Sequence, residues 1–326
     1  MDGCSQSSKE GIGEGYTSHV MLVTGCSSGI GMHTAVQAAM AGYEVWATMR
    51  DVAKDEKLRM LASNSGVQVM TSLAANRPKD SVGCSGEIVV DRLDVQDETS
   101  IQLSVERLLS RYRALDVVIN CAGVGMLGTV ETCTIQEIRS HFDINVLGAV
   151  RLIHHTMPTL RARGKGHMIF LSSVSGFRAI PCSEIYAGSK HALEGILEGF
   201  AAVAQLSGVH VTIMEPGPVQ TSFLENLKEN VGSRYMGEGN SLTKLMENFA
   251  THNSARLSNE SLPSGDDVAK QITQAINASE PPLRLQPDDY SKQCAANVLV
   301  EPSGQQLSRR NRQFILDLYS GSLEQS

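Results

Sequence analysis

Tyr186 and Lys190 form a Tyr-x-x-x-Lys pair in a segment whose pattern predicts a helix. A spacing of four residues places both side chains on one helix face. A free tyrosine titrates near ~10, and a nearby ammonium favours the phenolate, so we expect Lys190 to lower the pKa of Tyr186. Ser173 ends an apolar stretch that predicts a buried strand, and its hydroxyl would bond a substrate oxygen beside Tyr186. Such a group would transfer a proton to a carbonyl oxygen while a hydride reaches its carbon.

By itself, the Tyr-x-x-x-Lys spacing could also be a surface lysine beside a half-buried tyrosine. A second motif is therefore needed to indicate an active site. Near the N-terminal end, an apolar strand at 19–24 runs into Gly25, Gly29 and Gly31, and a helical stretch follows at 32–41. Glycines permit a tight turn, and the helix N-terminus offers unpaired N–H groups to a pyrophosphate. The spacing is Gly-x-x-x-Gly-x-Gly rather than Gly-x-Gly-x-x-Gly. We interpret it as a dinucleotide-binding loop; the alternative is a glycine-rich turn without a ligand.

Alternating strands and helices must position these residues. Short connections between them are typical of βαβ units, so we predict a Rossmann-type, doubly wound parallel sheet in a three-layer α/β/α arrangement. Ligands of such sheets bind at the carboxyl ends of the strands, where the motifs fall. The predicted strands are 19–24, 43–48, 87–90, 115–119, 167–171 and 209–214, and the predicted helices are 54–62, 98–112, 135–161 (bent near Pro158) and 183–206.

Composition excludes several classes of function. A net charge of −7 gives no electrostatic support for nucleic-acid binding. Seven cysteines with irregular spacing and no secretory signal favour free thiols in a reducing, cytoplasmic setting. No Cys/His cluster has the spacing of a metal site, so we predict no metal. No apolar run reaches the ~20 residues that span a bilayer, although peripheral membrane contact stays open.

Six motifs in fixed order resemble the short-chain dehydrogenase/reductase family over residues 18–285. Cys121 departs from the family pattern, which has a second Asn there. The motifs are Thr24-Gly25-Cys26-Ser27-Ser28-Gly29-Ile30-Gly31, Asn120-Cys121-Ala122-Gly123, Asn145, Ser173, Tyr186 with Lys190, and Pro216-Gly217.

The resemblance implies a catalytic role for four residues. Tyr186 would be the general acid/base, and Lys190 would lower its pKa and hold the nicotinamide ribose. Ser173 would position the substrate oxygen. Asn145, in the interior of a predicted helix where asparagine has poor propensity, would hold a water that connects Lys190 to solvent.

The resemblance also implies a set of cofactor-binding residues along the strand ends. Asp94 and Val95 would meet the adenine, and the turn that begins at Pro216 would back the nicotinamide. Asp94 could equally be a loop aspartate that caps a turn, and the proline turn could be a plain connection. The full set is Gly25, Ser27, Ser28, Gly29, Ile30, Gly31, Arg50, Asp94, Val95, Asn120, Ala122, Gly123, Tyr186, Lys190, Pro216, Gly217, Val219 and Thr221.

The end of the second strand decides the choice of cofactor. An acid there bonds the ribose 2′-hydroxyl of NAD, whereas an arginine accommodates the phosphate of NADP. The acid position holds Met49, and Arg50 follows with a guanidinium fork suited to phosphate. Asp51 would either neutralise Arg50 or face the ribose itself. We predict NADP(H), with NAD(H) as the alternative.

The stretches Ala47–Asp51, Ser189–Gly195, Glu215–Val219 and Pro281–Arg284 show a narrower resemblance to one branch of the family. That branch contains 17β-hydroxysteroid and photoreceptor retinol dehydrogenases. This implies a lipophilic small-molecule substrate, with a steroid favoured and a retinoid as the alternative. Apolar walls suit such a molecule. Family members often pair through the helices that hold Asn145 and Tyr186, so a homodimer is implied. The implied substrate residues are Ser173, Val174, Ile180, Ser183 and Pro218.

The predicted domain organisation is a single Rossmann domain at 19–286. A disordered segment rich in Gly and Ser precedes it at 1–18, and a polar C-terminal extension follows it at 287–326. Within the domain we expect a surface insertion at 71–86, and the resemblance implies a substrate lid at 222–262.

These observations predict an NADP(H)-dependent enzyme that interconverts a hydroxyl and a carbonyl. The alternative from another class is a non-catalytic NADP-binding regulator, whose mark would be the loss of Tyr186, Lys190 or Ser173. All three are present. A cofactor-competent scaffold for a protein partner is a third hypothesis.

Overall fold

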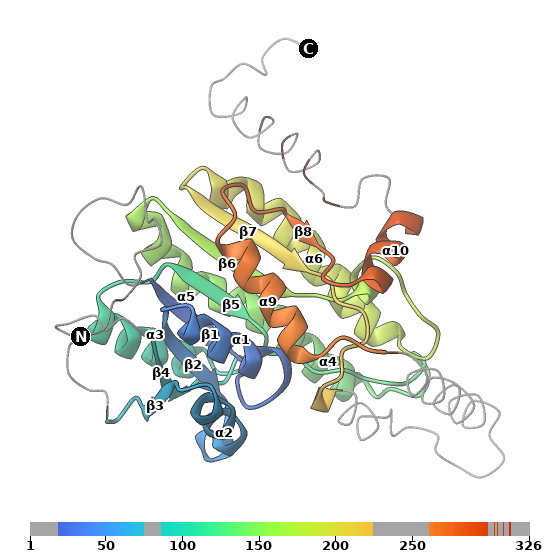
Figure 1. The fold of residues 1–326 in the computed structure, drawn as a ribbon. Coiled ribbons are helices and arrows are strands. Elements are labelled where there is room, and N and C mark those ends of the chain that lie inside the picture. Colours follow the sequence, from blue (N-terminus) through green and yellow to red (C-terminus); the bar gives the residue numbers. More distant parts are fainter. Residues whose placement is uncertain are drawn as a thin grey trace.

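A parallel β-sheet forms the centre of the molecule in the computed structural model, which describes residues 19–74, 86–223 and 261–298 and, beyond them, only residues 303, 305, 309 and 313 (Figure 1). Within this part of the chain the sheet has eight strands in the order β3-β4-β2-β1-β5-β6-β7-β8, and each pairing is parallel. The strands are β1 Val20–Thr24, β2 Glu44–Met49, β3 Gln68–Thr71, β4 Glu87–Arg92, β5 Val117–Asn120, β6 Gly166–Leu171, β7 Val209–Met214 and β8 Arg284–Leu285.

The direction of winding reverses between β1 and β5. From β1 the chain builds one half of the sheet outward through β2, and from β5 it builds the other half through β6 and β7. Open α/β sheets bind ligands in the crevice that this reversal creates beyond the carboxyl ends of the strands. The glycine loop follows β1 and the segment beginning at Cys121 follows β5, so both lie at the reversal.

Two separate cores cover the two faces of the sheet. Successive side chains of a strand point to opposite faces. In β1, Val20 and Leu22 therefore join one core and Met21 and Val23 the other. The first core contains helices α3 Glu98–Tyr112, α5 Gly148–Arg163 and α6 Glu184–Gln205. The second contains α1 Gly29–Met40, α2 Glu56–Asn64 and α9 Gly265–Ile276.

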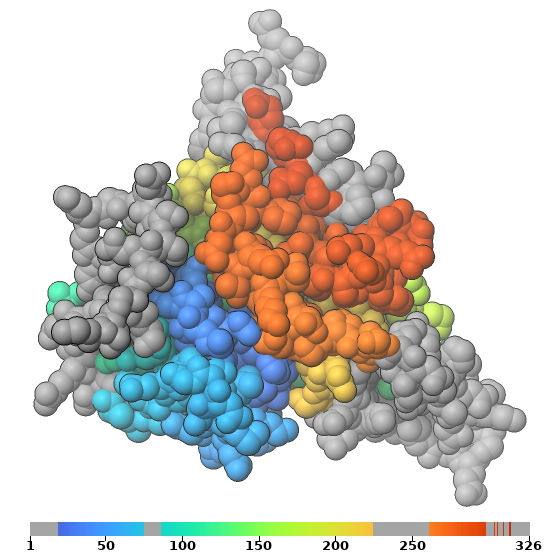
Figure 2. All heavy atoms as spheres, viewed as in Figure 1, coloured from blue at the N-terminus to red at the C-terminus, as the bar shows by residue number. Residues whose placement is uncertain are grey.

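Helix α9 brings the C-terminal part of the chain back to its beginning. Figures 1 and 2 show α9 (orange) lying beside α1 (blue). Gln37 Nε2 of α1 donates to Asp266 Oδ1 of α9 at 2.6 Å. The N-terminus of α9 is closed by a capping box in which Ser264 and Asp267 bond each other's backbone N–H groups.

The predicted fold class is confirmed, and most predicted elements coincide with observed ones. Helix α3 and strand β7 match their predicted bounds, and the others differ by a few residues at the ends. The predicted helix 135–161 is interrupted. It consists of α4 Ile135–Phe142, a π-helical turn η2 Asp143–Leu147, and α5, and Pro158 lies inside α5.

Strand β3, helix α9, strand β8 and helix α10 Asp289–Val298 were not predicted. Strand β3 lies at the edge of the sheet and is half-exposed, so its sequence lacks the apolar pattern of a buried strand. Strand β3 begins before the predicted insertion at 71–86 and ends at Thr71, the first residue of that insertion. Residues 75–85 of that insertion, 224–260 of the predicted lid, and the predicted disordered segment 1–18 lie outside the described residues. Two short 3₁₀ turns, η1 Val52–Lys54 and η3 Val174–Gly176, complete the elements used below.

Candidate active site

The carboxyl ends of the central strands open into a cavity of about 520 Å³. Its walls bring together residues that the sequence separates by more than a hundred positions. Asn120 and Asn145 are the predicted site residues that do not line it. Those that do are Gly25, Ser27, Ser28, Gly29, Ile30, Gly31, Arg50, Asp94, Val95, Ala122, Gly123, Ser173, Val174, Ile180, Ser183, Tyr186, Lys190, Pro216, Gly217, Pro218, Val219 and Thr221.

At two positions of the glycine loop there is no room for a side chain. Gly25 has φ +74°, and a Cβ there would lie 2.9 Å from Ala122 N. A Cβ on Gly31 would lie 2.5 Å from Gly25 O. Helix α1 begins at Gly29, its N-cap Ser28 makes no side-chain capping bond, and its first turn carries no acidic residue. The helix therefore presents unpaired N–H groups and the positive end of its dipole to the cavity, as an anion requires.

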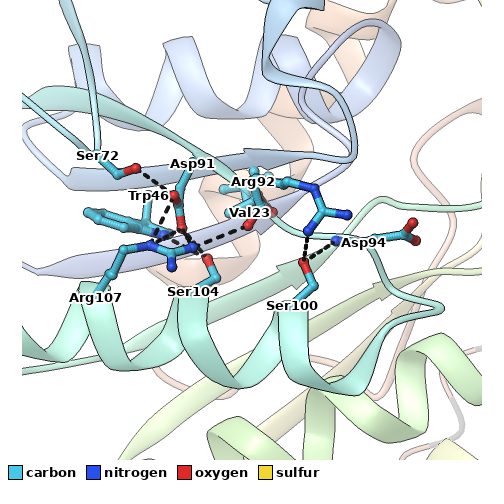
Figure 3. Close-up of polar contacts among 10 residues, drawn as sticks. Val23, Trp46, Ser72, Asp91, Arg92, Asp94, Ser100, Ser104 and Arg107 are labelled. Atoms are coloured by element: carbon cyan, nitrogen blue, oxygen red, sulfur yellow. Dashed lines mark hydrogen bonds and ion pairs between the residues drawn. The ribbon is translucent and has the colours of Figure 1, made fainter.

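Asp94 stands on a polar framework between β4 and α3 (Figure 3). Its backbone N–H donates to Ser100 Oγ at 3.1 Å, and its Oδ1 accepts from Gln96 N at 3.1 Å. Asp94 thus caps its own turn and also lines the cavity. Deeper in the same framework, Asp91 accepts from Ser104 Oγ at 2.6 Å and pairs with Arg107 at 2.8 Å.

The end of β2 brings two basic residues to the cavity wall. Arg50 and Lys54 line it together with Met49 and Asp51. Asp51 Oδ1 accepts from Ala53 N at 3.1 Å, which caps the 3₁₀ turn η1. The Asp51 carboxylate is therefore engaged with its own backbone, which weakens the alternative that it faces a ribose.

Tyr186 and Lys190 lie on the cavity side of α6, one turn apart. Lys190 Nζ is 5.9 Å from the centre of the Tyr186 ring and donates to Leu171 O of β6 at 2.7 Å. Burial lowers the pKa of Lys190 to about 8, although Glu194 acts in the opposite direction. Burial also raises the pKa of Tyr186 to about 12, and a hydrogen bond with Ser173 only partly offsets this.

The expectation of a lowered pKa for Tyr186 is therefore wrong, because its net pKa lies above the ordinary value. Burial destabilises the charged phenolate by more than the hydrogen bond with Ser173 stabilises it, so the pKa of Tyr186 rises. Tyr186 is a protonated phenol here, which is the form that donates a proton to a carbonyl oxygen.

Asn120 and Asn145 lie behind the cavity wall. Asn120 Oδ1 accepts from Thr24 Oγ1 at 2.8 Å, and Thr24 Oγ1 in turn accepts from Ala122 N at 3.1 Å. This bond ties the ends of β1 and β5 together, so Asn120 supports the loop instead of lining the cleft as predicted.

Asn145 lies in the π-helical turn η2, and its amide is fully engaged. Its Oδ1 accepts from Val124 N at 2.9 Å, and the two hydrogens of its Nδ2 are shared among Val124 O at 2.9 Å, His141 Nε2 at 2.9 Å and Ser189 Oγ at 3.2 Å. These contacts hold the cavity-lining segment Ala122–Val124 against α6, a positioning task that the sequence did not indicate.

The sequence also missed a contribution from the C-terminal segment. Tyr290 of α10 lines the cavity, and a Cβ on Gly217 would lie 2.6 Å from its ring. Gly217 N donates to Asp288 Oδ2 at 3.2 Å. The one local signal was an N-cap pattern, because Asp288 Oδ1 accepts from Ser291 N at 2.8 Å at the start of α10.

A buried ionic cluster supports the loop that carries Ser173. Arg284 of β8 pairs with Glu194, Glu198 and Glu215. Glu194 Oε1 also accepts from Ser172 Oγ at 2.5 Å, next to Ser173. Burial and the nearby Glu194 raise the pKa of Glu215 to about 8, although Arg284 acts in the opposite direction. The cluster thereby joins β7, β8 and α6 directly behind the candidate site.

Two features are absent from the described residues. No helix among them is long and apolar enough to cross a membrane. No group of three or more His, Cys, Asp or Glu side chains among them is arranged to hold a metal ion.

Comparisons with known proteins agree with this geometry. The family model for short chain dehydrogenase matches residues 58–232. Retinol dehydrogenase 8 of Bos taurus is 32% identical over 288 residues, which cover 87% of this chain and 86% of the relative. Human 17-beta-hydroxysteroid dehydrogenase type 1 is 30% identical over 292 residues, which cover 87% and 82%.

Solved structures show the same fold. A short chain dehydrogenase/reductase from Burkholderia phymatum in complex with NAD superposes with a TM-score of 0.70 at 19% identity, covering 89% of this chain and 95% of that one. Other structures of this fold hold NADP or NADPH. With the parallel sheet, the glycine loop and the Tyr186–Lys190 pair on the same cavity, these matches show that the chain belongs to the short-chain dehydrogenase family.

Proposed function

We propose that this short-chain oxidoreductase uses NADP(H) to interconvert a hydroxyl and a carbonyl on a lipophilic substrate, with a steroid favoured. One observation carries the proposal: Ser173, Tyr186 and Lys190 line the same cavity as the glycine loop. A dinucleotide on that loop and a substrate beside Tyr186 would share a single enclosed space, which hydride transfer between them requires.

The residues present fit a nicotinamide dinucleotide. The residues of the glycine loop line the cavity, and the uncapped start of α1 suits a pyrophosphate. Arg50 and Lys54 supply positive charge where β2 ends. This charge supports NADP(H) over NAD(H), because the 2′-phosphate is the only part of the cofactor that distinguishes them.

The proposed chemistry assigns one task to each side chain. The bound cofactor supplies or accepts the hydride. Tyr186, kept protonated by burial, donates its proton to the carbonyl oxygen in reduction and takes it back in oxidation. Ser173, hydrogen-bonded to Tyr186, orients that oxygen, and Lys190 places positive charge beside the phenolate that remains.

The wall around Tyr186 supports a lipophilic substrate. Leu127, Val174, Ile180 and Phe223 all line it, and the rings of Phe223 and Tyr186 lie 6.0 Å apart. Apolar walls with few convergent polar groups are typical of sites for steroids and polyenes. The two relatives, one named for retinol and one for a 17-beta-hydroxysteroid, keep a retinoid as the second candidate.

The test is NADPH oxidation followed by absorbance, with estrone and all-trans-retinal offered separately. Wild-type protein should turn over one of them, and Tyr186→Phe should lose at least about a thousandfold in kcat, since it lacks both acid and base. Turnover that survives in Tyr186→Phe would contradict the assigned chemistry. Tight NADPH binding without turnover of either substrate would favour the non-catalytic regulator.

We also propose that the protein forms a homodimer through α6. Ile196 and Val203, seven residues apart on this helix, are both exposed. Two exposed aliphatic side chains on one helix face are suited to pairing with a second copy. Light scattering after size exclusion should give twice the mass of the chain, and Ile196→Glu with Val203→Glu should give the mass of one chain.

A further inference from the structure

His141 is a buried histidine that the proposed chemistry does not use. It lies on α4, one turn before Asn145, and only 2% of it is exposed. Its ring packs edge-on against the ring of Tyr186, with centres 6.0 Å apart and planes at 75°. Burial and the charge of Lys190 lower its pKa to about 4, so the imidazole is neutral at physiological pH.

The hydrogen bonds around Asn145 determine which ring nitrogen of His141 carries the proton. His141 Nε2 lies 2.9 Å from Asn145 Nδ2. Val124 N donates to Asn145 Oδ1, which fixes the orientation of the amide. An amide nitrogen only donates, so His141 Nε2 must accept and the imidazole proton must be on Nδ1.

Through Asn145, this bond reaches both sides of the candidate site. The same Nδ2 lies 2.9 Å from Val124 O and 3.2 Å from Ser189 Oγ, so its two hydrogens serve three acceptors and one hydrogen is shared. Ser189 Oγ in turn donates to Tyr186 O at 2.7 Å. A Cβ on Gly123 would lie 3.3 Å from Asn145 Oδ1 and 3.7 Å from Lys190 Nζ, so Asn145 and Lys190 flank the same glycine.

We propose that His141 is a positioning residue of the active site. Its Nε2 holds the Asn145 amide, and its ring holds the Tyr186 side chain, so that one imidazole aligns both. The inference rests on the proposed function of Tyr186. Because the imidazole touches Asn145 and Tyr186 from the α4 side, its loss should disturb the proton-transfer step more than the binding of either substrate.

The hydrogen bond itself can be tested without any turnover. The full chain labelled with ¹⁵N-histidine contains nine histidines, and the signal missing from His141→Phe identifies His141. We expect a neutral ring protonated on Nδ1, with an unprotonated Nε2, throughout pH 6 to 8. A ring protonated on Nε2, or an imidazolium at pH 7, would overturn the proposal whether or not the enzyme reduces estrone or retinal.

The positioning role can be tested by two variants that separate the acceptor from the ring. His141→Gln retains an acceptor for Asn145 Nδ2, whereas His141→Phe retains an aromatic ring and no acceptor. We expect kcat to fall roughly tenfold in His141→Phe, with KM for the carbonyl within about twofold of wild type, and His141→Gln to recover most of the loss. His167→Gln, at a buried histidine of β6 that bonds Thr212, serves as the control and should keep the wild-type kcat.

The outcomes separate the two proposals. If wild-type protein shows no turnover, the proposed function fails, and the ¹⁵N measurement still decides the His141–Asn145 bond. If wild type is active and the Phe and Gln variants both keep full kcat, or both lose it equally, His141 is not the positioning acceptor. A fall in kcat that merely follows a fall in melting temperature, and that His167→Gln shares, would equally contradict the role.

Discussion

At the residue scale, cofactor choice depends on a few charges at the end of β2. Arg50 and Lys54 line the cavity, and the carboxylate of Asp51 is turned toward the backbone of η1. The arrangement offers a phosphate two cations, and one oxygen of the neighbouring Asp51 carboxylate is engaged by its own backbone. This is why we propose NADP(H), although structures of the same fold hold either cofactor.

Arg50→Ala should separate the two cofactors. Loss of a charge-assisted bond to the 2′-phosphate should raise KM for NADPH roughly tenfold, which corresponds to about 1.4 kcal/mol. KM for NADH should stay within twofold, because NADH lacks that phosphate. Initial rates with each cofactor provide the check and its internal control. An unchanged KM for NADPH, or equal losses with both cofactors, would contradict the role of Arg50.

Residues that act through local spacing could be predicted from sequence, and those that act across the fold could not. The spacing of Tyr186 and Lys190 along a helix, and of Gly25, Gly29 and Gly31 along a loop, is enough to predict how these residues lie relative to one another. Tyr290 and Asp288 meet Gly217 only because β8 returns the chain to the edge of the sheet. The importance of His141 was equally hidden, because a histidine on a helix shows no sign of what its ring touches.

At the element scale, the π-helical turn η2 gives Asn145 its position. Asp143 at its start accepts from Gln96 Nε2 at 3.0 Å and pairs with Arg151 at 2.6 Å, which ties the turn to the segment after β4 and to α5. Single π-turns inside helices are rare and often occur at functional sites. Sequence predicted one helix here because a single π turn within a long helix interrupts the apolar pattern too briefly to be recognised.

The C-terminal helix α10 forms part of the site through one close contact, which Gly217→Ala would test. The added methyl would lie 2.6 Å from the Tyr290 ring, so the ring or the turn must move. We expect a loss of about 1–3 kcal/mol in unfolding free energy and a several-fold higher KM for the carbonyl substrate. Urea denaturation and initial rates measure both.

The matched control for this variant is Gly195→Ala in α6, where an added Cβ meets nothing within 4 Å. It should be neutral or slightly stabilising, because alanine favours a helix. In a double-mutant cycle, Tyr290→Ala should cancel most of the effect of Gly217→Ala. If the two effects simply add, the clash with Tyr290 is not the cause.

At the scale of the whole molecule, buried titratable groups make stability depend on pH in opposing directions. Burial lowers the pKa of His167 to about 3 and of His141 to about 4. Below about pH 6.5 the unfolded chain takes up protons that the folded chain excludes, so these histidines reduce stability as the pH falls. Glu215, with a raised pKa, binds a proton in the folded state and acts the other way.

The contribution of His167 can be isolated with His167→Gln, which does not titrate. His167 lies in β6, where Nε2 donates to Thr212 Oγ1, since the Thr212 hydroxyl already donates to Pro282 O. Between pH 7.5 and 5, wild type should lose about 2 kcal/mol relative to this variant. Urea denaturation at the two pH values gives the difference, in which all other groups cancel. A difference that is the same at both pH values would refute the buried neutral state of His167.

The sheet as a whole could be predicted because its central strands are mostly apolar, as is typical of strands covered on both faces. Its outer parts could not. Strand β3 is half-exposed, and β8 is two residues long and pairs with β7. Neither leaves a periodic pattern, so neither strand was predicted.

Strand β8 is synthesised well after its partner β7, and this order affects the chain during translation. Ile213 and Glu215 donate backbone bonds to Leu283 and Leu285, and the nearby bond from Thr212 to Pro282 spans 70 residues. At roughly 5–20 residues per second, β7 emerges from the ribosome several seconds before its partner. For that interval the nascent chain carries a bare strand edge, and Glu194 and Glu215 have no Arg284 to pair with. Chaperones that bind extended segments would bind the exposed edge of β7. The translation rate of the last seventy codons before β8 would set how long that edge is exposed.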